Sequence, residues 1–329
     1  MKQGATMAPA TALELLPPQE TQTHITVLLS EAVAALNIRP DGIYVDGTFG
    51  RGGHSRLILE KLGVSGRLIA MDRDLTAFQS GALINDARFQ IVHQHFSALS
   101  QVLNDLDIRH VDGILLDLGI SSPQIDEGSR GFSFRFDAPL DMRMDQSRGK
   151  TAAEVLSTIT EQQLAEVIKN YGEERFAKQV ARSIIAQRTD GNTITTTGQL
   201  AKIVADAIPK IEPGQNPATR TFQALRIFVN QELEELSLIL PQCLNELVLG
   251  GRLAVISFHS LEDRIVKHFI RDEQNRDDLP SNFPILAKDL PQPRMMTVGR
   301  TIKPSAAEVK RNPRSRSAVL RVAERTSTT

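Results

Sequence analysis

The chain has 329 residues, 41% of them hydrophobic, with 21 Gly and 16 Pro, so it is long enough for about two domains and is neither disordered nor fibrous. No apolar run approaches the roughly 18 residues of a membrane span, and the single cysteine, Cys243, excludes disulfide frameworks and Cys-rich zinc sites and favours a cytoplasmic location. The net charge is −1, yet Arg294–Arg325 alone carries +7, which indicates either a localised phosphate contact or a solvated basic tail.

The first half of the chain alternates short apolar runs with helical patterns. Residues 1–22 are predicted to be a disordered extension, because they lack the apolar core of a signal peptide. Four runs then predict strands, at Ile43–Asp46, Arg67–Met71, Phe89–His93 and Val111–Leu118. Strands that alternate with helices favour a parallel, doubly wound α/β sheet.

The middle of the chain has a different pattern. Residues 121–145 have the composition of a loop, and helical periodicity runs from Thr151 to Pro209, with Thr160 and Thr197 as expected N-caps. We interpret residues 131–215 as an all-helical substrate-recognition domain. It is inserted into a sheet domain formed by residues 23–130 and 216–329.

The last third returns to a mixed pattern. Helices are expected from Ala218 to Leu249 with a break near Pro241, followed by a buried strand at Leu253–Phe258. A helix at Leu261–Arg271 and a closing strand at Ala318–Val322 complete the prediction. Residues 272–303 contain many prolines and receive no assignment.

A glycine-rich loop after the first strand indicates a nucleotide-like ligand. Gly50 and Gly52 let the backbone approach a ligand at a helix N-terminus. The dinucleotide fingerprint is not met, because Ser55 stands where its third glycine belongs. Asp72, at the end of the second strand, can accept hydrogen bonds from ribose hydroxyls. The pattern favours an adenosine ligand without a pyrophosphate, commonly S-adenosylmethionine, and a tight structural turn is the alternative.

A series of blocks along the chain resembles one family. The blocks are His24–Leu29, Tyr44–Ser55, Asp112–Gln124, Arg130–Phe134, Pro139–Asp145, Tyr171–Arg175, Asn216–Arg226 and Ile256–Arg264. Together they resemble the bacterial RsmH (MraW) family, which methylates N4 of a cytidine at position 1402 of 16S ribosomal RNA. The resemblance implies a class I S-adenosylmethionine-dependent methyltransferase, Rossmann-like, with an inserted helical domain, that acts on the small ribosomal subunit. Two departures are the extension Met1–Gln22 and Leu75, where the family usually has Pro.

The resemblance also implies which residues contact the cofactor. They are Gly52, Gly53, His54, Asp72, Phe96, Asp117 and Gln124. The loop backbone would receive the methionine end and Asp72 the ribose. Phe96 would face the adenine, although it also suits core packing. Asp117 ends the fourth strand, where a doubly wound sheet places its ligand crevice.

Methyl transfer to an amine requires alignment and an acceptor for the amine hydrogens. The Asn/Asp-Pro-Pro-aromatic loop of many amino methyltransferases is absent, since the loop here reads Leu118–Pro123. We therefore expect Asp117, or a carbonyl of that loop, to accept an N4 hydrogen, with His259 as the second candidate. Asp117 could equally anchor the cofactor or cap a loop.

Basic and aromatic residues are candidates for RNA contact. The predicted phosphate contacts are Arg220, Arg226, Arg311, Arg314 and Arg316. Phe132, Phe134 and Phe136 suit stacking on an extruded base, or pinning of their loop to the core. No metal is predicted, because His93 and His95 lack a third ligand and suit a solvated strand edge.

Other functions remain open at this point. A methyltransferase acting on DNA or protein and a non-catalytic RNA-binding assembly factor would both retain the fold. An NAD-linked oxidoreductase is disfavoured by the missing third glycine. The sequence leaves the oligomeric state open, a homodimer being one option.

Overall fold

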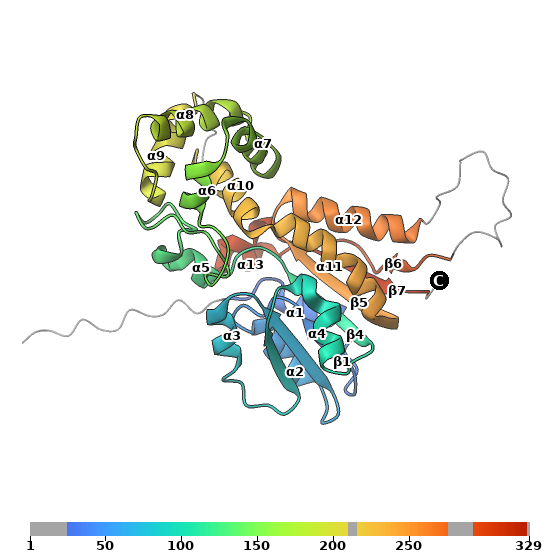
Figure 1. The fold of residues 1–329 in the computed structure, drawn as a ribbon. Helices are drawn as coiled ribbons and strands as arrows, with labels where there is room; N and C mark the ends of the chain where they lie inside the picture. Colours follow the sequence, from blue (N-terminus) through green and yellow to red (C-terminus); the bar gives the residue numbers. More distant parts are fainter. Residues whose placement is uncertain (1–24, 210–215, 276–291, 328–329) are drawn as a thin grey trace, which may run out of the picture.

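The computed structural model describes residues 25–209, 216–275 and 292–327. Its body is a seven-stranded sheet with the order β3-β2-β1-β4-β5-β7-β6 (Figure 1). The strands are β1 (Ile43–Asp46), β2 (Arg67–Asp72), β3 (Phe89–His93), β4 (Val111–Asp117), β5 (Leu247–Ser257), β6 (Met295–Thr297) and β7 (Val319–Arg325). β1 to β5 pair in parallel, and β7 is antiparallel to both of its neighbours. This topology confirms the expected doubly wound, Rossmann-like fold.

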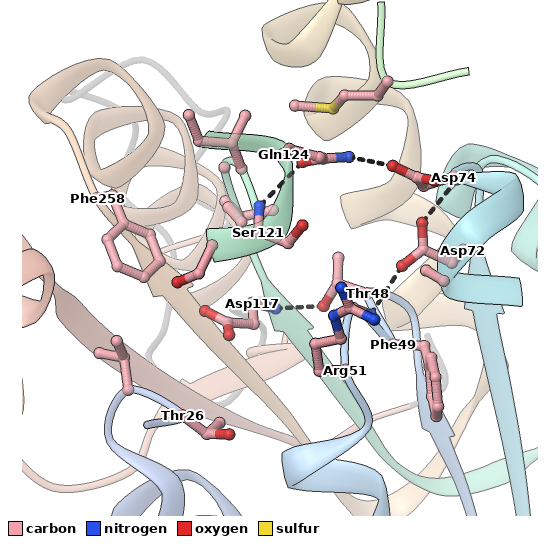
Figure 2. A pocket seen from close by; sticks show the side chains of 18 of the residues that line it. Thr26, Thr48, Phe49, Arg51, Asp72, Asp74, Asp117, Ser121, Gln124 and Phe258 are labelled. Carbon is pink, nitrogen blue, oxygen red and sulfur yellow. Dashed lines mark hydrogen bonds between the residues drawn. The ribbon is translucent and has the colours of Figure 1, made fainter. Parts of the chain in front are cut away.

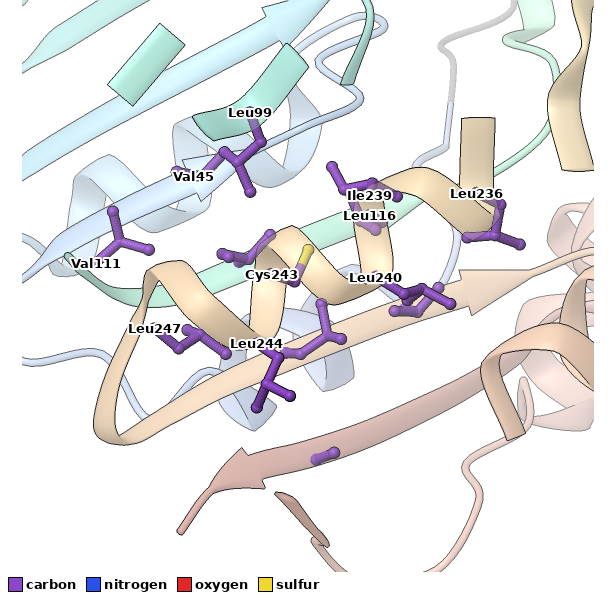
Figure 3. Packing of buried hydrophobic residues seen from close by; sticks show 14 of the residues in the cluster. Val45, Leu99, Val111, Leu116, Leu236, Ile239, Leu240, Cys243, Leu244 and Leu247 are labelled. Atoms are coloured by element: carbon purple, nitrogen blue, oxygen red, sulfur yellow. The ribbon is translucent and has the colours of Figure 1, made fainter. Parts of the chain in front are cut away.

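Helices cover both faces of the sheet. They are α1 (Leu29–Ala35), α2 (Gly53–Lys61), α3 (Leu75–Gly81), α4 (Leu99–Asp105), α11 (Glu232–Glu246) and α12 (Ser260–Gln274). Ile114 and Leu116 of β4 pack into the core with α4, α11 and α12, whereas Leu115 packs on the other face with α1 and α2. Figure 3 shows the first of these cores around Cys243. Burial on both faces explains the nearly continuous apolar run of β4.

A second group of helices forms a core of its own, above the sheet in Figure 1. They are α6 (Ala152–Thr158), α7 (Glu161–Gly172), α8 (Ala177–Thr189), α9 (Thr197–Ala207) and α10 (Thr219–Asn230). We call these helices, with the loop 131–151 that packs on them, the helical unit. Its core continues through Phe222 and Leu225 of α10, beyond the sequence-based boundary at residue 216. The assignment of domains stays a prediction.

The structure corrects several predicted boundaries. Thr160 caps α7 as expected, but Thr196 and not Thr197 caps α9. The break between the long helices lies at Gln231, whose φ is 50°, while Pro241 lies inside α11 on its exposed side. Solvent can satisfy the carbonyl that such a proline leaves without a partner.

Some elements escaped prediction altogether. These are α1, α5 (Ser122–Asp126), the short 3₁₀ helix η2 (Gly128–Arg130), β6 and α13 (Ala306–Arg311). The predicted extension at residues 1–22, and half of the unassigned stretch at 272–303, lie outside the described residues.

Candidate active site

A cavity of about 320 Å³ lies at the carboxyl ends of β1, β2 and β4 (Figure 2). Doubly wound sheets bind ligands at this edge. The site lies between β1 and β4, because the strands that follow β1 in the chain are added on one side and those that follow β4 on the other. The predicted cofactor residues that line it are Gly53, His54, Asp72, Phe96, Asp117 and Gln124. Gly52 lies at the N-cap of α2, one residue before Gly53.

The loop between β1 and α2 owes its shape to its glycines and to Asp46. Gly50 and Gly52 have φ values of 54° and 71°, which side chains rarely adopt. A Cβ on Gly53 would lie 1.9 Å from Oγ1 of Thr26, so only glycine fits there. Buried Asp46 accepts hydrogen bonds from the hydroxyl of Ser55 at 2.6 Å and the amide of Thr48 at 3.2 Å. Burial raises the pKa of Asp46 to about 6.

Asp72 ends β2 with both carboxylate oxygens facing backbone amides. Its Oδ2 accepts a hydrogen bond from Gly50 at 2.8 Å and its Oδ1 accepts one from Asp74 at 2.8 Å. Burial raises its pKa. Each oxygen retains a second lone pair, so the side chain can still accept hydrogen bonds from two ligand hydroxyls.

Asp117 ends β4 on the opposite wall of the cavity (Figure 2). Its amide donates to Oγ1 of Thr48 at 2.6 Å, which fixes the strand end against the glycine loop. Its Oδ2 lies 3.7 Å from Nδ1 of His54, and its buried Oδ1 has no hydrogen-bond partner in the described part of the chain. Burial, and then the charges of Asp46 and Glu262, raise the pKa of Asp117 well above its usual range. Asp117 thus contributes to the cavity wall a carboxylate that is 23% exposed and has unused acceptor capacity.

The ring of His259 faces Glu262 with both of its nitrogens. Its ring caps α12, with Nδ1 accepting from the amide of Glu262 at 3.4 Å and Nε2 lying 3.2 Å from Oε1 of the same residue. His259 is absent from the cavity lining, whereas Glu262 is part of it. The second candidate for catalysis therefore contacts its own helix, and Glu262 is a cavity residue that the sequence did not single out.

The predicted RNA-binding arginines fall into two groups. Arg226 lies in the cavity wall, where Nε and Nη2 each donate to Glu232 at 2.8 Å, and Arg314 pairs there with Asp126. Arg220 donates to the carbonyl of Glu173 at 3.3 Å. The exposed members of the set are Arg311 and Arg316. Of the five arginines, only these two can bind a phosphate without first breaking a contact with a carboxylate or a carbonyl.

The three phenylalanines of the loop differ in exposure. Phe132 is buried, and Phe134 packs edge-on against Phe222 of α10 with ring centroids 5.2 Å apart. Phe136 is 50% exposed. The first two pin the loop to the helical unit, so Phe136 alone of the three offers a ring to a ligand.

The structure adds a polar cluster that the sequence analysis missed. Gln124 caps α5 through the amide of Ser121 and donates to Oδ2 of Asp74 at 2.7 Å, and buried Arg130 donates to the same oxygen at 2.9 Å. The capping-box pattern Ser-x-x-Gln at 121–124 was the available signal for α5. No local pattern indicates the pairing with Asp74.

Two negative findings hold for the described ranges. No group of three or more His, Cys, Asp or Glu side chains there could hold a metal ion, and His93 and His95 have separate contacts, with the carbonyl of Arg73 and with Glu235. Within the same ranges, every helix is too short or too polar to cross a bilayer.

Comparisons with known proteins agree over nearly the whole chain. The family model of the MraW methylase family matches residues 21–326. Ribosomal RNA small subunit methyltransferase H of Methylobacillus flagellatus is 72% identical, over 95% of this chain and 97% of that protein. The protein of the same name from Azoarcus sp. strain BH72 is 62% identical, over 92% of this chain and 96% of that one. A solved rRNA methylase from Streptococcus thermophilus is 10% identical with a TM-score of 0.39, over 90% of this chain and 93% of that one.

Proposed function

Since the chain belongs to the MraW methylase family, we propose that it transfers the methyl group of S-adenosylmethionine to N4 of a cytidine, at position 1402, in the 16S rRNA of the small ribosomal subunit. The observation that carries this proposal is the partly exposed carboxylate of Asp117, which lines the same cavity as the glycine loop and Asp72 and has an oxygen without a hydrogen bond in the described ranges. The proposed cofactor site and the proposed proton acceptor thus line the same cavity. An enzyme acting on ribosomal subunits works in the cytoplasm.

The cavity fits S-adenosylmethionine by its donors and acceptors. The N-terminus of α2 at Gly53 offers backbone N–H groups to the carboxylate of the methionine end. Asp72 accepts from the ribose hydroxyls, and Phe96 provides an apolar face for the adenine. Gln124 acts on this site by holding α5 against Asp74. When bound, the cofactor supplies a methyl group already activated on a sulfonium.

The residues of this chain then have to align and deprotonate the amine. The N4 lone pair of cytosine is delocalised into the ring, so an acceptor that binds an N4 hydrogen raises its nucleophilicity. Oδ1 of Asp117 and Nε2 of His259 both lack a hydrogen bond in the described ranges, but Asp117 lines the cavity and His259 does not. We assign the acceptor role to Asp117.

The substrate RNA is expected to contact both parts of the molecule. The helical unit lies above the sheet in Figure 1, and its residues Met144 and Arg226 line the cavity. The exposed side chains of Arg311 and Arg316 can bind phosphates. The helical unit is accordingly the proposed substrate-recognition domain.

The test is transfer of labelled methyl groups to small ribosomal subunits and to naked 16S RNA, followed by mass analysis of the nucleosides. N4-methylated cytidine at one site is the expected product, and the preferred acceptor shows whether the folded subunit is recognised. Asp117→Asn should lower this transfer, and its matched control is Asp105→Asn, an exposed carboxylate outside the cavity lining, which should leave transfer unchanged. Cofactor binding without incorporation into either RNA would favour an assembly factor that retains the fold.

A further inference from the structure

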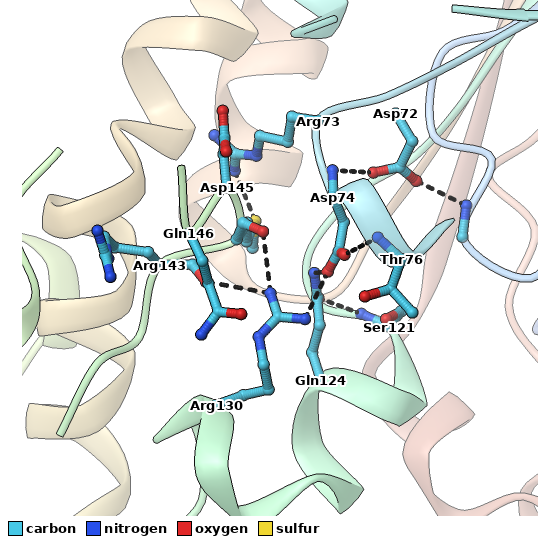
Figure 4. A network of polar contacts seen from close by, with 12 residues as sticks. Asp72, Arg73, Asp74, Thr76, Ser121, Gln124, Arg130, Arg143, Asp145 and Gln146 are labelled. Atoms are coloured by element: carbon cyan, nitrogen blue, oxygen red, sulfur yellow. Dashed lines mark hydrogen bonds and ion pairs between the residues drawn. The ribbon is translucent and has the colours of Figure 1, made fainter. Parts of the chain in front are cut away.

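The guanidinium of Arg130 is buried between the cofactor cavity and the helical unit (Figure 4). Its side chain is 6% exposed, and that of its partner Asp74 is 8% exposed. Nη1 donates to Oδ2 of Asp74 at 2.9 Å, while Nη2 donates to the carbonyls of Arg143 at 3.1 Å and Met144 at 2.9 Å. One planar group therefore holds oxygens from two separate parts of the molecule.

On the cavity side, hydrogen bonds connect Arg130 to the proposed ribose-binding carboxylate. The amide of Asp74 donates to Asp72, and Asp72 in turn accepts from the amide of Gly50 in the glycine loop. Asp74 also caps α3 through the amide of Thr76 at 2.9 Å. Burial raises the pKa of Asp74, but the hydrogen bonds and charge of Gln124 and Arg130 outweigh it, so the net pKa is lowered and the carboxylate stays ionised.

On the other side, the same group is tied to the helical unit. Met142 and Met144 belong to the core of that unit, and Asn230 at the end of α10 donates to the carbonyl of Met142 at 2.7 Å and accepts from the amide of Met144 at 2.8 Å. The guanidinium also lies over the ring of Phe132, 5.9 Å from its centroid. Movement of the 142–144 loop would therefore break the two hydrogen bonds of Arg130 Nη2 and those of Asn230.

A second arginine reinforces the connection. Arg73 stands between Asp72 and Asp74, and its Nη1 donates to the carbonyl of Asn230 at 2.8 Å. The ribose-binding turn after β2 is thus bonded to α10 directly as well as through Arg130. The turn and the base of the helical unit form one polar junction.

We propose that Arg130 is a positioning residue that couples cofactor binding to RNA recognition by joining the Asp72–Asp74 turn to the base of the helical unit. This inference rests on the proposed function. Only a planar fork with several donors can hold a carboxylate and two carbonyls at once, so a lysine in its place would keep the charge and lose the bridge. Coupling between two sites is reciprocal, so it can be measured from either ligand.

The experiment is a binding cycle on the full chain. The Kd for 16S RNA in the small subunit is measured with and without saturating S-adenosylhomocysteine, for the wild type, Arg130→Lys and Arg135→Lys. Arg135 is the matched control, because it lies only five residues further along, in the loop that follows η2, but is exposed. In the wild type, S-adenosylhomocysteine should lower the Kd for RNA by about tenfold, which is a typical coupling between two sites. Arg130→Lys should reduce this factor to below about twofold, whereas Arg135→Lys should keep it.

A role confined to folding would change both Kd values by the same factor and leave their ratio intact, and that outcome would overturn the proposal. Because Arg130→Lys could fail to fold, a second measurement uses the wild type alone. Addition of S-adenosylhomocysteine should slow amide hydrogen exchange of residues 142–146 as well as that of the glycine loop. Slowing in the glycine loop alone would contradict the bridge.

The two proposals fail in different ways. If the function is wrong, wild-type protein transfers no methyl group to 16S RNA. If only the bridge is wrong, the wild type methylates normally, while Arg130→Lys retains the wild-type ratio of RNA affinities.

Discussion

At the scale of single residues, the cavity depends on carboxylates whose ionisation is opposed by burial. Asp46, Asp72 and Asp117 all end strands of a parallel sheet and all have raised pKa values, with burial as the largest cause. Their neighbours differ. Asp46 and Asp72 accept hydrogen bonds from the loop, whereas Asp117 keeps an oxygen without one. The first two shape the site, and the third is available for chemistry.

Asp117→Asn should lower kcat by about 100-fold, a typical loss for one transition-state acceptor, while the affinity for S-adenosylhomocysteine changes little. Because only the ionised carboxylate can take up the proton that leaves N4, wild-type activity should rise with pH through the raised pKa of Asp117. Steady-state kinetics and calorimetry measure the two quantities. Weakened cofactor binding with an unchanged kcat would instead make Asp117 a cofactor anchor.

Asp46 should make the stability of the ligand-free protein dependent on pH. Its folded-state pKa of about 6 lies above the ordinary 3.8, so the folded state binds the proton more tightly than the unfolded state. The contribution is fully present below pH 3.8 and is lost as pH rises through 6. The loss amounts to about 3 kcal/mol, at 1.36 kcal/mol per pKa unit. Urea unfolding across this pH range should show that the free energy of unfolding falls less steeply with pH in Asp46→Asn than in the wild type. An identical fall in both proteins would refute the raised pKa of Asp46.

At the scale of elements, the junction between α10 and α11 determines where the helical unit meets the body. Gln231 is exposed and adopts a left-handed conformation, ending one helix and starting the next without a side-chain cap. This conformation costs a residue with a Cβ about 1 kcal/mol or more, and glycine far less. The turn is therefore imposed by the packing of α10 and α11 and not by local preference.

Replacement of Gln231 by glycine should raise the free energy of unfolding by about 0.5 kcal/mol, because relief of strain exceeds the added chain entropy. Gln231→Val, with a β-branched side chain at the same site, should lower it by about 1 kcal/mol. Urea denaturation of the pair isolates backbone strain, since the native side chain has no hydrogen bond in the described ranges. Equal effects of the two variants would show that the conformation is not the cause.

At the scale of the whole molecule, charge is distributed unevenly around an almost neutral total. The basic stretch Arg294–Arg325 pairs several of its arginines with carboxylates of the body, among them Arg294 with Glu273 and Arg321 with Asp263. Arg311 and Arg316 are exposed and have no ion pair in the described part of the chain. Together with the exposed Arg300, Lys303 and Lys310 of the same stretch, they add unpaired positive charge to this side of the described structure.

The double variant Arg311→Glu/Arg316→Glu should weaken binding to the small subunit and reduce its dependence on salt. Each lost phosphate contact lowers the slope of log K against log salt by about 0.7 to 0.9, so two contacts account for roughly 1.5. Arg109→Glu, at the amino end of β4 and hence at the opposite edge of the sheet, is the control. Unchanged affinity across a salt titration would exclude both arginines from the interface.

The sequence by itself predicted the five parallel strands of the sheet and the edge at which their carboxyl ends meet. Buried strands are read from continuous apolar runs, and Asp72 and Asp117 share one edge because parallel strands end at the same side. The turn at Gln231, the direction of the His259 ring, the Arg226–Glu232 pair and the Arg130–Asp74 bridge were decided only by the tertiary structure. The reason is physical. Periodicity records which side of an element is buried, whereas the partner of a buried polar group is set by where distant elements pack.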